Sequence, residues 1–374
     1  MTDGGKISSD YRIVQTLPTI QYLLARRCEV IIISHLGRPK GEFDKEFSLE
    51  PVSQRLAELL EVPVEFIDDC CNDNVKQKLK RSMPGKVTLL ENVRFYPGEE
   101  SNDPEFAQYL KDAIKPAYVV HDEFGAIHRA HASTEGISHL VPAVAGLLLE
   151  TEVVTLLSAI EDPARPLVAV MGGAKISDKL PLVERFLKTA DKVLVGGAMA
   201  NNFLSEQNHP IGKSLVDTEG AQHVSSIISA AKPGQLFIPQ DVAVGASVSV
   251  EAKRSDVGLD EVGDSNVILD LGYETMRQYA DIVSSARTVI WNGPLGMTSL
   301  EQFAQGSMAM AQALSDNHET LDCIVGGGDT ADFVLDWLEK NPKGTFKHIS
   351  TGGGASLELL SGAKLPGVEA LLSK

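Results

Sequence analysis

Short apolar runs alternate with longer stretches of helical periodicity along most of the chain. Such runs are typical of strands buried on both faces of a sheet, and the stretches between them are long enough for crossover helices. The strand-like runs are residues 29–34, 64–68, 86–92 and 117–121 in the first half, and 167–172, 192–197, 236–240, 267–272, 288–293, 322–327 and 347–351 in the second. The alternation predicts an α/β fold with mostly parallel sheets.

One long amphipathic stretch separates the two halves. Residues 145–166 (AGLLLETEVVTLLSAIEDPARP) have a helical pattern that ends at Pro163 and Pro166, because proline does not continue a helix. We expect this helix to form the boundary between two α/β halves. A short helix near 367–373, after Pro366, is expected to end the chain.

Composition narrows the class of protein. A length of 374 residues suggests two or three domains. The net charge of −17 argues against a nucleic-acid-binding surface. The four cysteines have no CxxC spacing, and neither a signal peptide nor a long apolar run is present. We therefore expect no membrane segment, no disulfide framework and a reducing, cytoplasmic location.

Basic side chains follow several early strands, and they stand out because the overall charge is negative. They are His35, Arg38, Arg94, His128, Arg129 and His131. Arg12 begins a helical stretch after residues 8–10 (SSD), which we expect to cap its N-terminus. Arginine suits forked recognition of carboxylate and phosphate, and parallel strand ends share one edge. Any one of these residues alone could be a solvated loop charge, but together they predict a shared anion site. Zinc is not predicted, because the histidines lack spacings such as HExxH.

Glycine pairs and triplets follow several strands of the second half. Glycine at such a junction lets the backbone approach a ligand closely, and the following helix offers free N–H groups. The glycines are Gly172, Gly173, Gly196, Gly197, Gly327, Gly328, Gly352, Gly353 and Gly354. One pair alone could serve only helix–sheet packing, whereas the repetition predicts a nucleotide site. Neither GxxxxGK[ST] nor GxGxxG occurs at these junctions, so an ordinary P-loop or dinucleotide site is not predicted.

Few charged residues accompany these glycines. Lys175 and Lys179 are four residues apart, a spacing that would place both near one helix face. Asp329 and Thr330 lie at a helix start, where the carboxylate could either cap the helix or hold a phosphate-bound Mg²⁺. No Ser-His-Asp or Cys-His arrangement and no acid–base pair of carboxylates stands out. Phosphoryl transfer tolerates that absence, because its catalysis is mostly positioning and neutralisation of charge.

Eight motifs along the chain occur in the order seen in phosphoglycerate kinases. They are SHLGRP (34–39), LLENVRF (89–95), GGAKISDK (172–179), GGAMANNF (196–203), IGKSL (211–215), WNGPLG (291–296), GGGDT (326–330) and STGGGASLELL (350–360). From about residue 4 to its C-terminus the chain resembles this family, and the motifs together are highly specific.

The resemblance implies two Rossmann-like domains joined by a long helix. The implied parts are a phosphoglycerate-binding domain (1–146), a linker helix (147–163), a nucleotide-binding domain (164–350) and a C-terminal segment (351–374) that returns to the first domain. A cytoplasmic, monomeric glycolytic enzyme with hinge closure is implied as well. Its reaction would be reversible phosphoryl transfer between 1,3-bisphosphoglycerate and MgADP, giving 3-phosphoglycerate and MgATP.

The resemblance also assigns roles to residues. Phosphoglycerate binding is implied for His35, Arg38, Arg94 and Arg129. Stabilisation of the transferring phosphoryl group is implied for Arg12, Lys175, Gly353 and Gly354, with Gly352 at the same helix start. Nucleotide contacts are implied for Gly172, Gly173, Lys179, Gly196, Gly197, Asn292, Pro294, Gly327, Gly328 and Thr330, and Asp329 would hold Mg²⁺ through the nucleotide phosphates. The expected partners are therefore small-molecule substrates, with neither nucleic acid nor membrane.

The chain departs from the family pattern at its beginning. Family members start with a strand carrying R-x-D-x-N-V-P, whose Asp and Asn bind phosphoglycerate, whereas this chain starts with MTDGGKISSDYRI. Met1 is then either an internal methionine taken for the start, which we favour, or the first residue of a protein that lacks the strand. Losing a central parallel strand would leave both neighbours unpaired.

Two further departures lie inside motifs. The family's N-D-A-F-G-T-A-H-R reads HDEFGAIHR at 121–129, so Glu123 adds negative charge near an anion site and Ala126 loses a hydroxyl. The V-F-E that usually follows G-P-x-G, with its Glu on the ribose, is replaced by Met297, Thr298 and Ser299. Ribose binding is therefore in question.

Three functions compete. The leading hypothesis is an active phosphoglycerate kinase. The second is a weak or inactive relative that binds nucleotide or a partner with little turnover, which the missing strand, Glu123 and Ser299 favour. Retention of Arg12, Lys175, Lys179 and Asp329 favours activity. A different two-domain sugar or acyl kinase would require the motifs to coincide by chance.

Overall fold

The computed structural model describes residues 7–79 and 84–372. The chain divides into two compact units: unit 1 comprises Met1–Val153 and Lys364–Lys374, and unit 2 comprises Val154–Ala363. The division falls inside helix α6 (Leu147–Glu161), which begins in one unit and ends in the other. Within the described residues, no helix is both long and apolar enough to cross a membrane.

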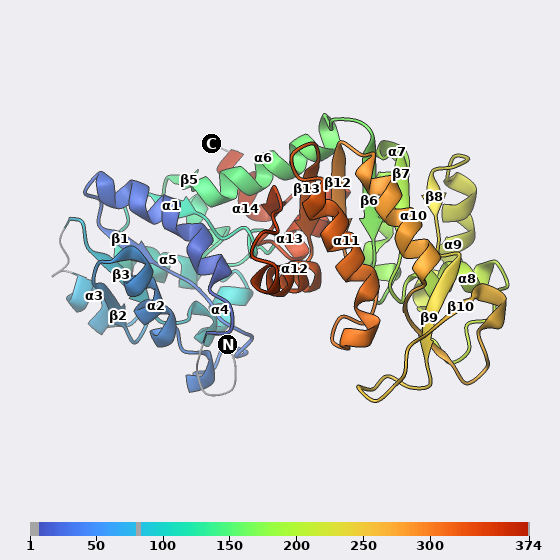
Figure 1. The fold of residues 1–374 in the computed structure, drawn as a ribbon. Coiled ribbons are helices and arrows are strands. Elements are labelled where there is room, and N and C mark those ends of the chain that lie inside the picture. Colours follow the sequence, from blue (N-terminus) through green and yellow to red (C-terminus); the bar gives the residue numbers. More distant parts are fainter. Residues whose placement is uncertain (1–6, 80–83, 373–374) are drawn as a thin grey trace. The chain divides into compact units, whose positions relative to one another are not determined.

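Unit 1 contains two small parallel sheets (Figure 1). The first has the order β1 (Val30–Ile32), β3 (Val87–Leu90), β2 (Val64–Ile67), and the second pairs β4 (Val119–His121) with β5 (Ala143–Ala145). The helices are α1 (Tyr11–Ala25), α2 (Glu50–Leu60), α3 (Asp73–Leu79), α4 (Pro97–Glu100), α5 (Pro104–Ile114) and α14 (Pro366–Leu372). Short 3₁₀ turns are η1 (Lys45–Phe47), η2 (Val93–Phe95) and η3 (Gly136–His139).

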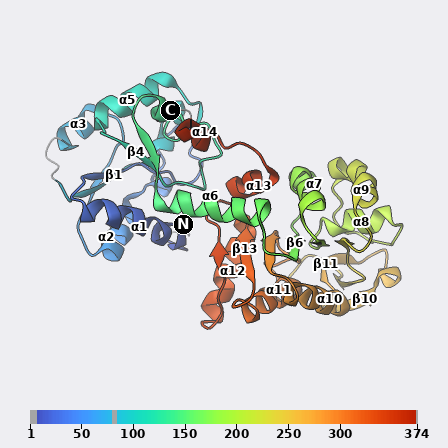
Figure 2. The same ribbon diagram turned by 90° about the horizontal axis from the view of Figure 1, so that it is seen from above.

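Helices cover both faces of the three-stranded sheet, with α1 and α2 on one side and α3 and α5 on the other (Figure 2). Because strand side chains alternate between faces, Val87 packs with Ile20 and Leu56 on the first side. Leu90 packs with Leu110 on the second. The fully apolar strands of the sequence therefore reflect burial on two faces.

Unit 2 is built on a six-stranded parallel sheet. Its order is β14 (His348–Ile349), β13 (Asp322–Gly326), β12 (Thr288–Asn292), β6 (Leu167–Met171), β7 (Lys192–Val195), β8 (Leu236–Phe237). A second, antiparallel sheet has the order β10 (Ser255–Gly258), β9 (Asp241–Gly245), β11 (Val267–Leu271). The helices are α7 (Leu180–Thr189), α8 (Ala200–Glu206), α9 (Thr218–Ala230), α10 (Tyr273–Ser284), α11 (Gln305–Asp316), α12 (Gly328–Lys340) and α13 (Gly354–Ser361), with η4 (Ser177–Lys179), η5 (Leu259–Glu261) and η6 (Glu301–Phe303) between them.

The predicted α/β class with mostly parallel sheets is confirmed, and every predicted strand-like run contains a strand. Three strands were not predicted: β5, β9 and β10. The run at 267–272 forms β11 in the antiparallel sheet, so it does not extend the parallel one. The predicted helix at 145–166 is α6, which ends at Glu161, two residues before Pro163. Proline disfavours helical backbone at the residue that precedes it, which accounts for this end.

Candidate active site

The six-stranded sheet of unit 2 has one topological switch point. From β6 the chain proceeds outward through β7 to β8, and from β12 it proceeds in the opposite direction through β13 to β14. Since β6 and β12 are parallel neighbours, the loops that follow them diverge at the carboxyl edge. Ligands of open α/β sheets bind in the crevice at such a point.

Backbone from three loops meets at this edge. The Gly172 amide donates to the Asn292 carbonyl (2.9 Å), and the Gly173 amide donates to the Pro294 carbonyl (2.8 Å). Gly197 has φ +64°, and a Cβ there would lie 2.6 Å from the Gly173 nitrogen. Only glycine allows this approach, so the predicted glycine loops do converge.

Lys179 lies across the switch point. Its Nζ donates to the carbonyl of Gly172 (2.8 Å), directly after β6, and to that of Asn292 (3.2 Å), the last residue of β12. Burial lowers the pKa of Lys179 to about 8, against the opposing effect of Asp329 and Asp178. A cation held at this position can neutralise the charge of a phosphate.

The prediction that Lys175 and Lys179 share a helix face is wrong. Lys179 ends the turn η4, helix α7 begins only at Leu180, and Lys175 is exposed in the preceding loop. Before the helix, the loop after β6 is bound to the loop after β12, where the Gly173 amide donates to the Pro294 carbonyl (2.8 Å). The two lysines therefore differ in burial, and only Lys179 is held by backbone carbonyls.

The side-chain amide of Asn292 is the residue-level observation that most favours a ligand site here. The side chain is 1% exposed, yet within the described residues neither Oδ1 nor Nδ2 has a hydrogen-bond partner. A Cβ on Gly327 would lie 3.2 Å from Nδ2, so the amide faces the loop after β13. Leaving a buried amide unpaired is costly, and a polar ligand would remove that cost. Thr330 beside it accepts a hydrogen bond from the Gly293 amide (2.7 Å).

Two helices begin next to each other at this edge. Helix α12 follows Gly327 (φ +90°) and α13 follows Gly353 (φ +49°), and neither N-cap residue supplies a side-chain cap. A Cβ on Gly353 would lie 3.9 Å from the Gly328 nitrogen. The free N–H groups and the dipoles of both helices thus favour an anion at one place.

Asp329 is exposed in the first turn of α12, and its carboxylate caps no amide within the described residues. Of the two roles left open by the sequence, helix capping is therefore not observed. The carboxylate remains free to hold a divalent cation beside bound phosphates.

In unit 1 the predicted basic residues come together. The charges of Arg12, Arg94 and His131 all act on His35, and those of Arg38 and Arg129 act on Arg94. Burial, followed by these positive charges, lowers the pKa of His35 to about 3, so its imidazole is neutral. Burial, opposed by Glu100 and Glu99, lowers the pKa of Arg94 as well. So many cations near one point predict an anionic ligand.

The ENVRF segment holds Arg94 in place. The amide of Asn92 donates to the carbonyls of Leu36 (2.8 Å) and Phe47 (3.0 Å), and its oxygen accepts the Arg94 N–H (3.0 Å). The Arg94 guanidinium donates to the Gly37 carbonyl (2.9 Å) and lies 3.5 Å from Glu100. The loops after β1 and β3 are thereby joined behind the basic cluster.

The expected cap at residues 8–10 is only partly present. Asp10 occupies the N-cap position of α1, but its side chain caps no amide and instead pairs with Arg55 (2.7 Å). The Ser9 hydroxyl accepts the Tyr11 N–H at 3.4 Å. Arg12 in the first turn is exposed beside the basic cluster. The expectation about the family's first strand concerns the beginning of the chain, and residues 1–6 lie outside the described residues.

A phosphoglycerate kinase family model matches residues 1–363. The chain belongs to the phosphoglycerate kinase family. It is 46% identical to a phosphoglycerate kinase of Herpetosiphon aurantiacus over 99% of this chain and 92% of the relative. Identity to a phosphoglycerate kinase of Moorella thermoacetica is 45%, over 100% of this chain and 93% of the relative.

Solved structures agree with this assignment. A phosphoglycerate kinase structure from Coxiella burnetii matches with a TM-score of 0.85 at 40% identity, and one from Pyrococcus horikoshii OT3 with a TM-score of 0.87 at 31% identity. Each match covers 100% of this chain and 93% of the other. The match therefore includes both units.

One arrangement of catalytic type escaped the sequence analysis. His121 at the end of β4 lies between Glu123 (Nδ1 to Oε1, 2.7 Å) and Ser138 (Nε2 to Oγ, 2.6 Å), a Ser-His-Glu line. The sequence did not indicate this contact, because Ser138 is 15 to 17 positions from its partners and meets them only in the fold. Ser138 and His121 are buried (0% and 1% exposed), so this serine has no access to a substrate.

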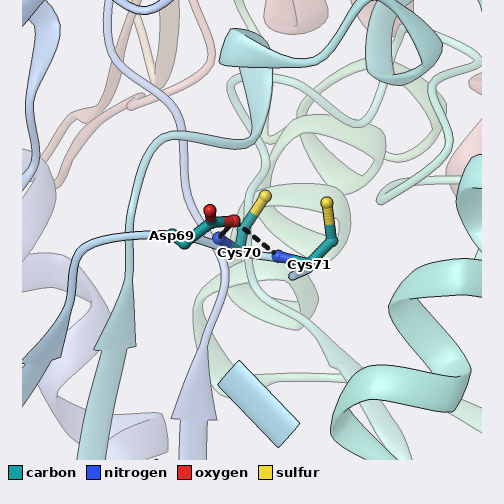
Figure 3. Close-up of side chains that lie close together, drawn as sticks. All are labelled: Asp69, Cys70 and Cys71. Carbon is teal, nitrogen blue, oxygen red and sulfur yellow. Dashed lines mark hydrogen bonds between the residues drawn. The ribbon is translucent and has the colours of Figure 1, made fainter. Parts of the chain in front are cut away.

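A second cluster, Asp69, Cys70 and Cys71, has atoms close enough to hold a metal ion (Figure 3). Its carboxylate is already in use: Oδ1 accepts the amides of Cys70 (2.7 Å) and Cys71 (3.0 Å) and the Tyr96 hydroxyl (2.7 Å). Oδ2 accepts the Asn72 amide (2.5 Å). These hydrogen bonds stabilise the turn that follows β2, so the cluster is explained as part of the turn without a metal ion.

Proposed function

We propose that this chain catalyses reversible phosphoryl transfer between 1,3-bisphosphoglycerate and MgADP, giving 3-phosphoglycerate and MgATP, as a cytoplasmic monomer in glycolysis. The observation that carries the proposal is the unpartnered, buried Asn292 amide at the switch point of a chain in this family. Most buried polar groups are paired, so an unpaired amide at the switch point supports a polar ligand there.

The nucleotide is assigned to unit 2. The close-packed glycines Gly172, Gly173, Gly196 and Gly197 lie at the carboxyl edge of the sheet. The other proposed nucleotide contacts are Asn292, Pro294, Gly327, Gly328, Thr330 and Lys179. Lys179 would neutralise phosphate charge, since its Nζ is already held at the crevice. Asp329 would hold Mg²⁺, because its exposed carboxylate is a hard oxygen donor next to the helix N-terminus. Bound there, the ion would neutralise phosphate charge during transfer.

The phosphoglycerate is assigned to unit 1. His35, Arg38, Arg94 and Arg129 supply the contacts, with arginine forks for its carboxylate and phosphate. A neutral His35 donates one N–H and accepts at its other ring nitrogen, which suits a hydroxyl of the substrate.

The transferring group needs positive charge and no general base. The acceptor is a carboxylate, which is already ionised at neutral pH. Arg12 and Lys175 are both exposed and would meet the charge spread over the phosphoryl oxygens. The free N–H groups at Gly353 and Gly354 would do the same from the start of α13.

The alternative of a decayed relative is less well supported. Four relatives named phosphoglycerate kinase are 41–46% identical to this chain over 99–100% of its length. The basic cluster and the crevice are both assembled. Glu123, which suggested decay, is paired with His121.

Trapping the acyl phosphate tests this function. The chain is incubated with MgATP, 3-phosphoglycerate and hydroxylamine, which converts an acyl phosphate into a hydroxamate. We expect hydroxamate to accumulate in step with ADP. ADP without hydroxamate would indicate another phosphate acceptor, and neither product would contradict the proposal.

A further inference from the structure

Behind the basic cluster, a buried chain of hydrogen bonds links β4 to η3. His121 contacts Glu123 at Nδ1 (2.7 Å) and Ser138 at Nε2 (2.6 Å), so both ring nitrogens have partners. The other carboxylate oxygen of Glu123 accepts the Asp122 N–H (2.8 Å). The polar atoms of this chain of hydrogen bonds are thus paired with one another, and His121 and Ser138 are buried.

These bonds hold the segment that presents Arg129. The carbonyl of Glu123 accepts the amides of Ala126 (2.9 Å) and Ile127 (3.1 Å), which form the turn leading to Arg129. On the other side, η3 is fixed to the same segment, because the Gly136 amide donates to the His131 carbonyl (3.1 Å). Glu123 and Ser138 therefore stand at the two ends of the loop that carries Arg129 and His131.

Charge gives the pair a second role. Glu123 contributes to the raised pKa values of Asp122 and Glu99, where burial is the larger cause, so the three carboxyl groups lie near one another. Burial lowers the pKa of His121, but the charge and hydrogen bond of Glu123 outweigh burial and the net shift is upward. When His121 is protonated, its positive charge offsets the negative charge of Glu123.

We propose that His121 and Glu123 are paired positioning residues for the phosphoglycerate site: His121 neutralises Glu123 and, through it and Ser138, holds the 121–138 segment that presents Arg129. This inference rests on the proposed function. The family pattern has Asn and Ala at positions 121 and 123, and the two departures compensate each other. Neither residue is a catalytic residue, because both act through the loop that carries Arg129.

A double-mutant cycle tests the pairing, since the double variant restores the family residues at both positions. In H121N, Glu123 is left uncompensated, and we expect KM for 3-phosphoglycerate to rise about tenfold with KM for MgATP within about twofold. In H121N/E123A the KM should return to within about twofold of wild type. A KM in H121N/E123A as high as in H121N, an unchanged KM in H121N, or equal effects on both substrates would overturn the proposal.

Calorimetric binding of 3-phosphoglycerate is the second measurement. It does not depend on turnover, and it compares wild type with H121N/E123A, so it does not require the single variant H121N to be stable. Failure of turnover in wild type would count against the proposed function, and the binding cycle would still decide the pairing. As pH rises through the raised pKa of His121, the imidazolium is lost, so wild-type affinity should fall relative to H121N/E123A. The other titratable groups around the pair, Asp122, Glu99, Glu135, His128, His131 and His139, are present in both proteins. Parallel pH profiles would refute a charge role for His121.

Discussion

At the scale of single residues, Lys179 affects both the free energy of unfolding and the proposed binding of nucleotide. Its folded-state pKa is lowered from 10.5 to about 8 by burial, so between these pH values the unfolded chain binds more protons than the folded one. The free energy of unfolding should then rise with pH in this window, by up to about 3 kcal/mol, at about 1.4 kcal/mol per pKa unit.

Replacing Lys179 by methionine should remove this rise and stabilise the protein at pH 7, while KM for MgATP increases. The measurement is urea unfolding of wild type and K179M between pH 7 and 10, with K175M as the control because Lys175 is exposed. Taking the difference between the two proteins cancels the titration of all other groups. Parallel profiles for wild type and K179M would show that Lys179 is not strained by burial.

Arg94 gives a second prediction at this scale. Its side chain is 12% exposed and has the like charges of Arg38 and Arg129 nearby. R94M should raise KM for 3-phosphoglycerate by about 10- to 100-fold, since a forked charge contact is lost, and R94K should recover only part. KM for MgATP should be unchanged. R277M alters an exposed arginine on α10, and both of its KM values should equal those of wild type. An increase of the KM for 3-phosphoglycerate in R277M similar to that in R94M would contradict a specific role for Arg94.

At the scale of elements, helix α13 allows strain and function to be separated. Glycine with positive φ precedes it at Gly353 (φ +49°) and follows it at Gly362 (φ +90°). Alanine should cost about 1 kcal/mol of stability at Gly362, which lies in the left-handed region, and more at Gly353, whose ψ of −108° lies outside that region. Only G353A would also place a methyl group near the Gly328 amide, where the phosphoryl group is proposed to bind.

We therefore expect both G353A and G362A to lose stability in urea unfolding, G353A by more, with kcat reduced at least about tenfold only in G353A. Steady-state kinetics at saturating substrates makes the comparison. Equal kcat in the two variants would mean that the start of α13 takes no part in transfer.

The elements also show where sequence pattern suffices. Buried parallel strands such as β6 and β12 are continuous apolar runs and were predicted, because burial on two faces leaves a strong signal. By contrast, β10 is exposed along half its length and β5 is only three residues long, so neither has an apolar run to detect. The antiparallel pairing of β9 with β10 and β11 depends on contacts distant in sequence.

At the scale of the whole molecule, both candidate sites follow from one rule, that parallel strands end at a common edge. That rule predicted that Arg94 would join His35 and that the glycine loops would meet. It carried no information on the pairing of His121 with Ser138, because a contact between β4 and η3 has no sequence period. The burial of Lys179 was equally hidden, since its neighbour Lys175 has the same side chain and is exposed.

The central claim is that the chain transfers a phosphoryl group between nucleotide and phosphoglycerate. Initial rates of the full chain with MgATP and 3-phosphoglycerate test it most directly. We expect a rate that saturates in both substrates at roughly 1–10³ s⁻¹. R94M should weaken only the phosphoglycerate dependence, and K179M only the nucleotide dependence. Nucleotide binding in calorimetry without any phosphoryl transfer would contradict the claim.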